Sequence, residues 1–295
     1  AHTVIGEKAD LVAATLDDVQ RWFRKYYTPS NAVPAPRGHI PLATAREKAS
    51  HWFGAIPPCQ PPPRPDSWIA DITPQRRDRY QANVASGTLL LVWNIPQAGS
   101  PDATLLSLAA DYLASGLSSV LVKNLVYIRK TASSVQAEVA DGALCSQFIL
   151  SATVAGEQSL AALEQSLLDE LHAFLAQPCD GPRLREVKND ALNLFRDSYK
   201  TSAQIAALLS VSRVTLGHAD AFRQQLSQLD EASPDDLHQA VQRWLSPPPH
   251  TPEIAPFSAR TDESAPAAPR TPPPLLQPPA PLLPPQALPA RPGTG

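Results

Sequence analysis

The sequence contains no methionine and only three cysteines among its 295 residues. Cys59, Cys145 and Cys179 are widely spaced and odd in number, a pattern that fits neither a zinc knuckle nor a disulfide framework. We therefore interpret them as ordinary thiols. Because residue 1 is alanine and methionine is absent, we expect the chain to be a processed product or an internal piece of a longer one.

Long apolar runs and a strong excess of one charge are also missing. No run of roughly eighteen apolar residues occurs, and no basic-then-apolar leader precedes the first expected helix, so we predict neither a membrane span nor a signal peptide. The formal net charge of −3 and the pI near 6.2 lack the basic footprint of a nucleic-acid-binding protein. We therefore expect no nucleic acid and no membrane as partner, and the compartment stays open.

Motifs with a known chemistry are absent as well. None of the seven histidines has a His or Glu neighbour at the spacing of a zincin helix. The sequence also has no G-x-S-x-G elbow, no G-x-G-x-x-G fingerprint and no Walker loop. Taken alone, the residues therefore indicate no catalytic centre and no metal site.

Proline, in contrast, is abundant, with 33 residues in the chain. A cluster at 57–65 predicts an extended linker. About half of all prolines follow residue 246, where composition changes abruptly and aromatic residues become rare. Such a segment cannot bury a core, so we expect an extended tail that acts as a linker, with a proline-rich ligand for a recognition domain as the other option.

One helical pattern occurs twice. Thr15 followed by Asp17 and Asp18 predicts a capped helix with an apolar stripe at Val19, Trp22, Phe23 and Tyr26, and Pro29 ends it. The stretch Ser233–Pro247 repeats this pattern at a constant offset of 233 − 15 = 218 residues. An internal duplication explains the match, and so do two unrelated helices that share a common start signal.

The remaining pattern predicts an α+β fold with antiparallel sheets, because helices and hairpin-like strand pairs occur in mixed order. Residues 1–14 are expected to be a loop. Pro34 and Pro36 remove ladder donors, so residues 32–38 should form an edge or a loop. The periodicity predicts helices at Leu42–Phe53, Asp102–Gly116, Leu117–Ile128, about 160–175, 182–216, Ala219–Leu229 and 233–245, and strands at Thr88–Ile95, Ala132–Val139 and Phe148–Val154.

The first block of the chain resembles the pitrilysin/insulinase family of zinc metallopeptidases. In that family a capped helix runs into Tyr-x-Pro-x-Asn-Ala, followed by a strand that ends in Gly and a helix that ends in Phe-Gly-x-Ile-Pro. The matching residues here are Tyr27, Pro29, Asn31, Ala32, Gly38, Phe53, Gly54, Ile56 and Pro57. Weaker similarities continue at 93–96, 113–119 and 186–189, so that the resemblance covers about residues 2–250.

The resemblance implies duplicated α+β domains of this type (metallohydrolase-like), each an antiparallel sheet covered by helices on one face, with the first domain incomplete. We expect the end of a first domain at 1–57, a proline-rich linker at 58–75, a second domain at 76–250 and a disordered inter-half linker at 251–295. His39 stands where the family has Asp after the glycine. The family's long members also make a periplasmic parent one option.

The resemblance places the zinc-binding H-x-x-E-H motif upstream of residue 1. We therefore expect no catalytic and no metal-binding residue in this chain, with zinc present in the full-length enzyme. The family's substrate-binding Arg and Tyr fall on Tyr127 and Ser133 here, and Arg129 is out of register. No substrate-binding residue is therefore predicted.

Three functions follow from these observations. The first is a non-catalytic portion of a zinc endopeptidase, which encloses a peptide together with the missing catalytic half. The second is an inactive scaffold subunit that assembles with a homologous catalytic partner. The third is an unrelated α+β interaction module with a proline-rich tail. Whether the chain has any enzymatic activity of its own is left open by the sequence.

Overall fold

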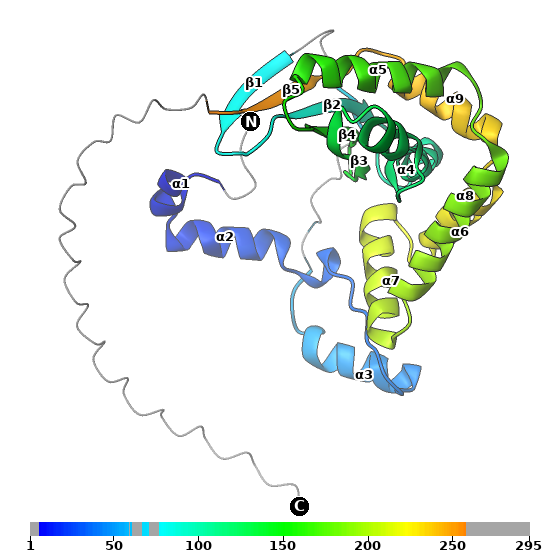
Figure 1. Cartoon of the computed structure of the whole chain (residues 1–295). Coiled ribbons are helices and arrows are strands. Elements are labelled where there is room, and N and C mark those ends of the chain that lie inside the picture. Colours follow the sequence, from blue (N-terminus) through cyan, green and yellow to red (C-terminus); the bar gives the residue numbers. More distant parts are fainter. Residues whose placement is uncertain (1–5, 59, 61–66, 71–76, 258–295) are drawn as a thin grey trace, which may run out of the picture. The chain divides into compact units, whose positions relative to one another are not determined.

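The computed structural model describes residues 6–58, 60, 67–70 and 77–257 (Figure 1). The predicted tail from residue 258 onward and most of the predicted linker at 58–75 lie outside these residues. All of the described residues belong to one compact unit, Ala1–Phe257. The fold below is that of this unit.

A five-stranded sheet is the centre of the fold. Its strands are β1 (Arg77–Ala82), β2 (Thr88–Ile95), β3 (Ala132–Ala140), β4 (Ser146–Val154) and β5 (Thr251–Pro256), in the spatial order β1-β5-β2-β4-β3. All neighbours are antiparallel except β1 and β5, which run parallel. The predicted α+β class with antiparallel pairing is confirmed.

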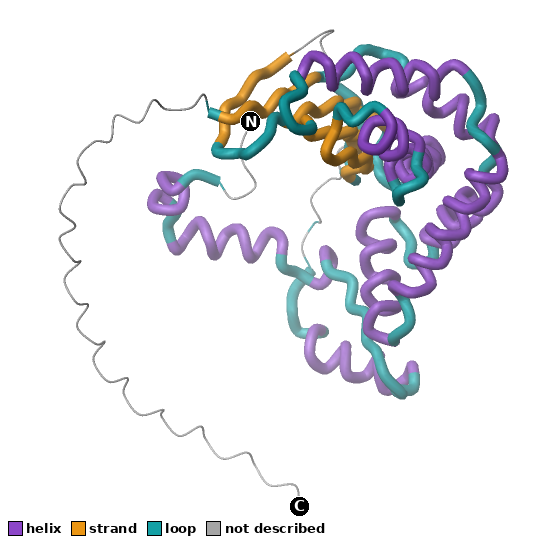
Figure 2. Tube along the Cα trace, viewed as in Figure 1, coloured by secondary structure: helices purple, strands orange, loops and turns teal. Residues whose placement is uncertain are grey.

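Helices cover one face of this sheet (Figures 1 and 2). Helices α4 (Pro101–Ala114), α5 (Leu160–Ala176) and α9 (Pro234–Leu245) contact the strands, and α6 (Gly181–Ser198) and α8 (Ala221–Glu231) contact α4. The other elements are α1 (Lys8–Ala13), α2 (Leu16–Tyr26), η1 (Pro29–Asn31), α3 (Leu42–Phe53), the π-helix η2 (Val122–Ile128) and α7 (Ser202–Leu216). Of the helices in the described residues, none is long and apolar enough to cross a membrane.

Alternation along β2 and β4 builds the core. Because successive side chains of a strand point to opposite faces, every second residue of β2 meets the helices. Trp93 and Phe148 lie opposite each other in the ladder and pack edge to face, with ring centroids 5.9 Å apart. The Trp93 indole N–H donates to the Pro247 carbonyl at 2.8 Å, which ties the segment after α9 to the sheet.

The other face of the sheet is not covered by these helices. We call it the open face and define it by Leu90, Asn94, Ile149, Ser151 and Thr153, which alternate with core residues and are half-buried. The backbone N–H and C=O groups of β2 and β4 are used in the ladder between them. A ligand on this side would therefore contact their side chains. These five residues offer aliphatic, hydroxyl and amide groups, and Glu138 of β3, opposite Ile149, adds a carboxylate at the edge of this face.

Two capping boxes begin α2 and α9, as the sequence predicts. The Thr15 hydroxyl accepts from the Asp18 N–H, and the Asp18 carboxylate accepts from Thr15; Ser233 and Asp236 repeat the arrangement. The hydrogen bonds from the Thr15 hydroxyl and N–H lower the pKa of Asp18 to about 2. Those from Ser233 lower the pKa of Asp236.

Several expectations about the elements were wrong. Residues 8–13 form α1 rather than a loop. The expected break at Gly116, whose φ is +80°, is confirmed, but the helix after it begins at Val120 because Leu117–Ser119 form a turn. Residues 251–256, assigned to the tail, form β5. Pro252 has no N–H to donate. The ladder between β5 and β2 pairs only Glu253 and Ile254, so the proline removes no hydrogen bond from it.

Strand β1 was not predicted at all. Its charged sequence lacks a strand pattern, and it is held by its parallel ladder with β5 and by long-range ion pairs. Arg77 pairs with Glu164 of α5 and with Glu253 of β5, and the Asp78 carboxylate lies 2.9 Å from His250 Nε2. The expected loop at 32–38 is confirmed, because these residues belong to no strand in the described structure.

The two capping boxes allow a matched test. Ser233→Ala should lower the free energy of unfolding by about 1 kcal/mol, because α9 packs into the core and loses a cap acceptor. Thr15→Ala should reduce helicity locally but leave the unfolding midpoint unchanged, because no residue of α2, described throughout its length, is buried. Urea denaturation followed by circular dichroism measures both. Equal losses of stability would contradict this difference.

The lowered pKa of Asp236 predicts a pH dependence. A depressed folded-state pKa stabilises the fold above the ordinary value of 3.8, and this stabilisation is lost as the pH falls through the lower folded-state pKa. Asp236→Asn should therefore destabilise the protein at about pH 6, and the difference from the parent should shrink at about pH 3. Unfolding free energies at a series of pH values measure it, and a difference independent of pH would refute it.

Candidate functional site

The motif residues after α2 form a tight turn. Pro29 opens the single turn η1, where its missing N–H needs no partner. The Asn31 side-chain amide donates to the Tyr26 carbonyl at 2.9 Å, which satisfies one of the free carbonyls at the end of α2. Tyr27 lies between the two elements and is exposed. Asn31 thus fixes the direction in which the chain leaves α2.

The second set of motif residues ends α3. Gly54 is the C-cap of this helix, and a Cβ atom on it would collide with the Ser50 carbonyl oxygen. A larger residue would therefore shift the chain that leads to Ile56 and Pro57. Phe53, the last residue of α3, is exposed.

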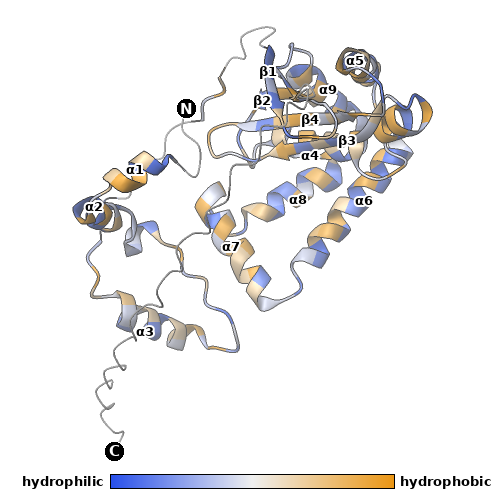
Figure 3. Cartoon of the chain, turned by 60° about the vertical axis from the view of Figure 1, so that its left-hand side comes forward, coloured by the Kyte–Doolittle hydropathy of each residue, from blue (hydrophilic) through white to orange (hydrophobic). Residues whose placement is uncertain are grey.

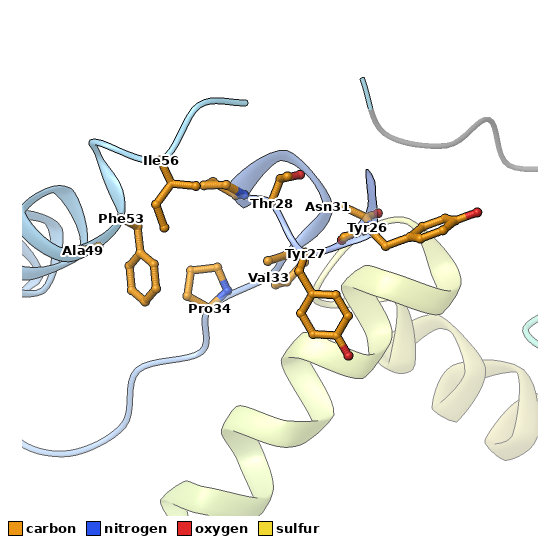
Figure 4. Close-up of a pocket in the computed structure, with 11 residues that line it drawn as sticks. Tyr26, Tyr27, Thr28, Asn31, Val33, Pro34, Ala49, Phe53 and Ile56 are labelled. Carbon is orange, nitrogen blue, oxygen red and sulfur yellow. Dashed lines mark hydrogen bonds between the residues drawn. The ribbon is translucent and has the colours of Figure 1, made fainter. Parts of the chain in front are cut away.

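These two sets meet in one groove of about 670 Å³. Figure 4 shows Phe53 and Ile56, from the end of α3, directed toward Pro34, which follows η1. The full lining is Tyr26, Tyr27, Thr28, Pro29, Asn31, Ala32, Val33, Pro34, Ala49, Phe53 and Ile56. Gly38, Gly54 and Pro57 are outside this lining. Gly38 has a φ of +120°, a conformation that favours glycine.

The chemistry of the groove is that of an apolar contact surface. Its polar groups are the hydroxyls of Tyr26, Tyr27 and Thr28 and the Asn31 amide, and its lining contains no Asp, Glu, His, Cys, Lys or Arg. Such a lining offers no carboxylate, imidazole or thiolate, the side chains that most often act as bases or metal ligands. The groove is therefore suited to contact with an apolar segment.

The positions that align with the family's substrate-binding pair lie elsewhere. Tyr127 belongs to η2 and is exposed, and Ser133 lies at a bulge of β3, where its hydroxyl donates to the Thr153 carbonyl at 3.3 Å. Arg129 pairs with the buried Glu170 at 2.9 Å. The structure thus does not bring Tyr127 or Ser133 into the groove, and that neither of them binds substrate stays a prediction.

The described residues contain no group of three or more His, Cys, Asp or Glu side chains placed to hold a metal ion. Burial raises the pKa of the Cys179 thiol, which disfavours the thiolate that metal binding and nucleophilic attack require. Cys145 is also a free thiol, and Cys59 lies outside the described residues.

One cavity was not anticipated from the sequence. A smaller groove of about 220 Å³ lies among α4, α6 and α8, where Thr104, Ser107, Phe195 and Phe222 line it beside Asp141. Its residues come from four separate stretches of the chain. No local pattern could therefore have revealed it.

Comparison with known proteins gives a family. The family model described as the peptidase M16 inactive domain matches residues 13–190, more than half of the chain. A search of curated proteins gives no match.

Solved structures show the same fold. The peptidase M16 inactive domain from Pseudomonas fluorescens has a TM-score of 0.73 at 17% identity, and the match covers 87% of this chain and 61% of that one. A protease from Helicobacter pylori has a TM-score of 0.72 at 18% identity, with coverage of 86% and 62%. Complex III2 from Candida albicans has a TM-score of 0.70 at 14% identity, with coverage of 86% and 62%.

This chain spans about three fifths of the length of each of these structures. At such low sequence identities the structural likeness shows only the fold. The family model, which matches residues 13–190, identifies the family to which the sequence belongs. The resemblance seen in the motif residues is therefore confirmed, and the chain belongs to the peptidase M16 (pitrilysin/insulinase) family, whose inactive domain it matches.

Proposed function

We propose that this chain is a non-catalytic portion of a zinc metalloendopeptidase and forms part of the wall of a peptide-enclosing chamber. A catalytic half, or a homologous subunit, would supply the zinc ion and activate the water that attacks the peptide carbonyl. The open face carries this proposal, because it is an extended surface of the fold without covering helices.

The composition of the open face suits an unfolded peptide of variable sequence. Leu90 and Ile149 offer aliphatic contacts, and Asn94, Ser151 and Thr153 offer hydrogen-bonding groups. The Asn94 side chain already donates to the Ala70 carbonyl at 2.9 Å, so this face binds a backbone carbonyl group in the structure itself.

The chemistry of the described residues agrees with a supporting role. Neither the groove beside α3 nor the open face combines a nucleophile, a base and a metal ligand set. The relative from Helicobacter pylori is a protease, of which this chain covers 62%. We place the catalytic residues in the part of the enzyme that corresponds to the uncovered remainder of such a relative.

A second candidate is an inactive scaffold subunit that assembles with a partner. The likeness to a chain of complex III2 favours it, because the same fold occurs there in a multi-subunit assembly. A neighbouring reading frame that encodes H-x-x-E-H would favour the enzyme portion over the scaffold. The third function expected from the sequence, an unrelated interaction module, is wrong because the chain belongs to the peptidase family.

The proposal predicts that the purified chain binds no stoichiometric zinc and cleaves no peptide. Elemental analysis and hydrolysis of a quenched-fluorescence peptide measure both quantities on the same sample. One zinc per chain, together with cleavage that a chelator abolishes, would refute the supporting role. Such a result would require a zinc site from side chains that are not grouped to hold a metal ion in the described part of the structure.

The chamber wall can be tested with a photoreactive amino acid. Placed at position 149 on the open face, it should crosslink to an unfolded peptide present at high concentration. Placed at position 165, an exposed site on α5 that serves as the matched control, it should not. Mass spectrometry of the crosslinked product gives the yields. Equal yields at the two positions would contradict a peptide-binding role for the open face.

A further inference from the structure

The smaller groove of about 220 Å³ lies on the helical side of the sheet and not on the open face. Its walls come from α4, α6 and α8, which contact one another, and Figure 3 shows hydrophobic and hydrophilic residues mixed along α6 and α8. We call it the Asp141 groove, after the one charged residue in its lining. Pockets for small molecules usually measure roughly 300–1,000 Å³. The smaller volume of this groove suits a single side chain.

The carboxylate of Asp141 has no partner of its own. It makes no hydrogen bond or ion pair within the described residues, and burial raises the pKa of this carboxyl above its ordinary value of 3.8. A carboxylate that has lost water without gaining a partner is stabilised by an incoming cation. One carboxylate is too few for a metal ion, which takes several ligands. The charge therefore favours an organic cation.

The aromatic wall of the groove favours the same chemistry. Phe195 of α6 and Phe222 of α8 are half-buried and stack with ring centroids 6.0 Å apart. The Arg223 Cζ atom already lies 5.9 Å from the centroid of the Phe222 ring, although Arg223 is not part of the lining. Ring faces attract cations, and a planar guanidinium stacks on them better than an ammonium does. Rings and carboxylate together are complementary to an arginine side chain.

A second groove, of about 360 Å³, continues from the first and shares Gly99 and Gln225 with it. Gly99 has a φ of +84°, and a Cβ atom on it would collide with Leu216 at the end of α7. The second groove is lined by the side-chain amides of Gln97, Gln224 and Gln225, which make no hydrogen bond within the described part of the chain. Such amides both donate and accept, as the backbone of an extended peptide requires.

We propose that the Asp141 groove binds an arginine side chain from an extended segment of a partner protein, whose backbone lies in the second groove. The guanidinium donates to the Asp141 carboxylate and lies against the rings of Phe195 and Phe222. Its aliphatic stem contacts Leu226 and Leu229, which also line the groove. This inference goes beyond the proposed function, because a segment bound on the helical side is not enclosed by the open face.

The probe is the peptide acetyl-Gly-Arg-Gly-amide, titrated into the full chain and followed by amide chemical shifts. We expect a Kd of about 1 mM, the weak range of a ligand held by one side chain. The shift changes should lie in α4, α6, α8 and around Asp141. The citrulline peptide, a neutral isostere, should bind at least about tenfold more weakly, because it loses the charged hydrogen bonds. The lysine peptide should also bind more weakly, since an ammonium does not stack on the rings.

Two aspartates provide a matched pair of variants. Asp141→Asn should weaken binding of the arginine peptide at least about tenfold. Asp111→Asn is the control, because burial also raises the pKa of Asp111, which has no partner within the described residues but lies outside the lining. It should change the Kd less than about twofold. Phe222→Leu should weaken binding about threefold through loss of the ring face.

Three results would each overturn the proposal. They are equal affinities for the arginine peptide and either the citrulline or the lysine peptide, equal effects of Asp141→Asn and Asp111→Asn, and shift changes confined to residues outside the two grooves. The peptide comparison uses the unaltered chain, so it decides the matter even where a variant does not fold. Neither zinc nor cleavage enters these measurements, so failure of the proposed function leaves them unaffected.

Discussion

The cover that α9 and α5 place over β2, and that α4 places over β3 and β4, is the packing on which the rest of the structure depends. Trp93 connects its parts, because its ring packs on Phe148 and its N–H reaches the Pro247 carbonyl behind α9. Asp102 adds a polar link between the start of α4 and the end of α9. These contacts close one face of the sheet and leave the open face without covering helices.

The same requirement explains the part of the chain that has no core. Helices α2 and α3 have apolar residues at helical spacing, yet no residue of either helix, both fully described, is buried. An amphipathic helix gains most of its stability from packing, so α2 depends on its capping box and on local ring contacts such as Trp22 with Tyr26. The motif residues of the family gather here, where they shape a surface rather than a catalytic centre.

Local patterns predicted much of this fold. The cap at Thr15, the helix Leu42–Phe53 and the strand Thr88–Ile95 agree with the structure, because caps, helical periodicity and apolar runs act over a few residues. Strands β1 and β5 were missed because pairing and ion pairs across the chain, such as Arg77 with Glu253, hold them. Six residues of the apolar groove were named as motif residues, namely Tyr27, Pro29, Asn31, Ala32, Phe53 and Ile56, but that they surround one groove could be known only from the structure.

The central claim is that the region from β1 to β5 has a packed core, whereas α2 and α3 have no buried residue. Hydrogen exchange of the chain alone tests it most directly, because amides in a packed core exchange only through global unfolding, whereas uncovered helices open locally. The account predicts that Leu91 and Leu150 exchange at the global rate and that amides of α2 exchange orders of magnitude faster. Equal protection of α2 and β2 would show that α2 is already packed, and it would contradict the account.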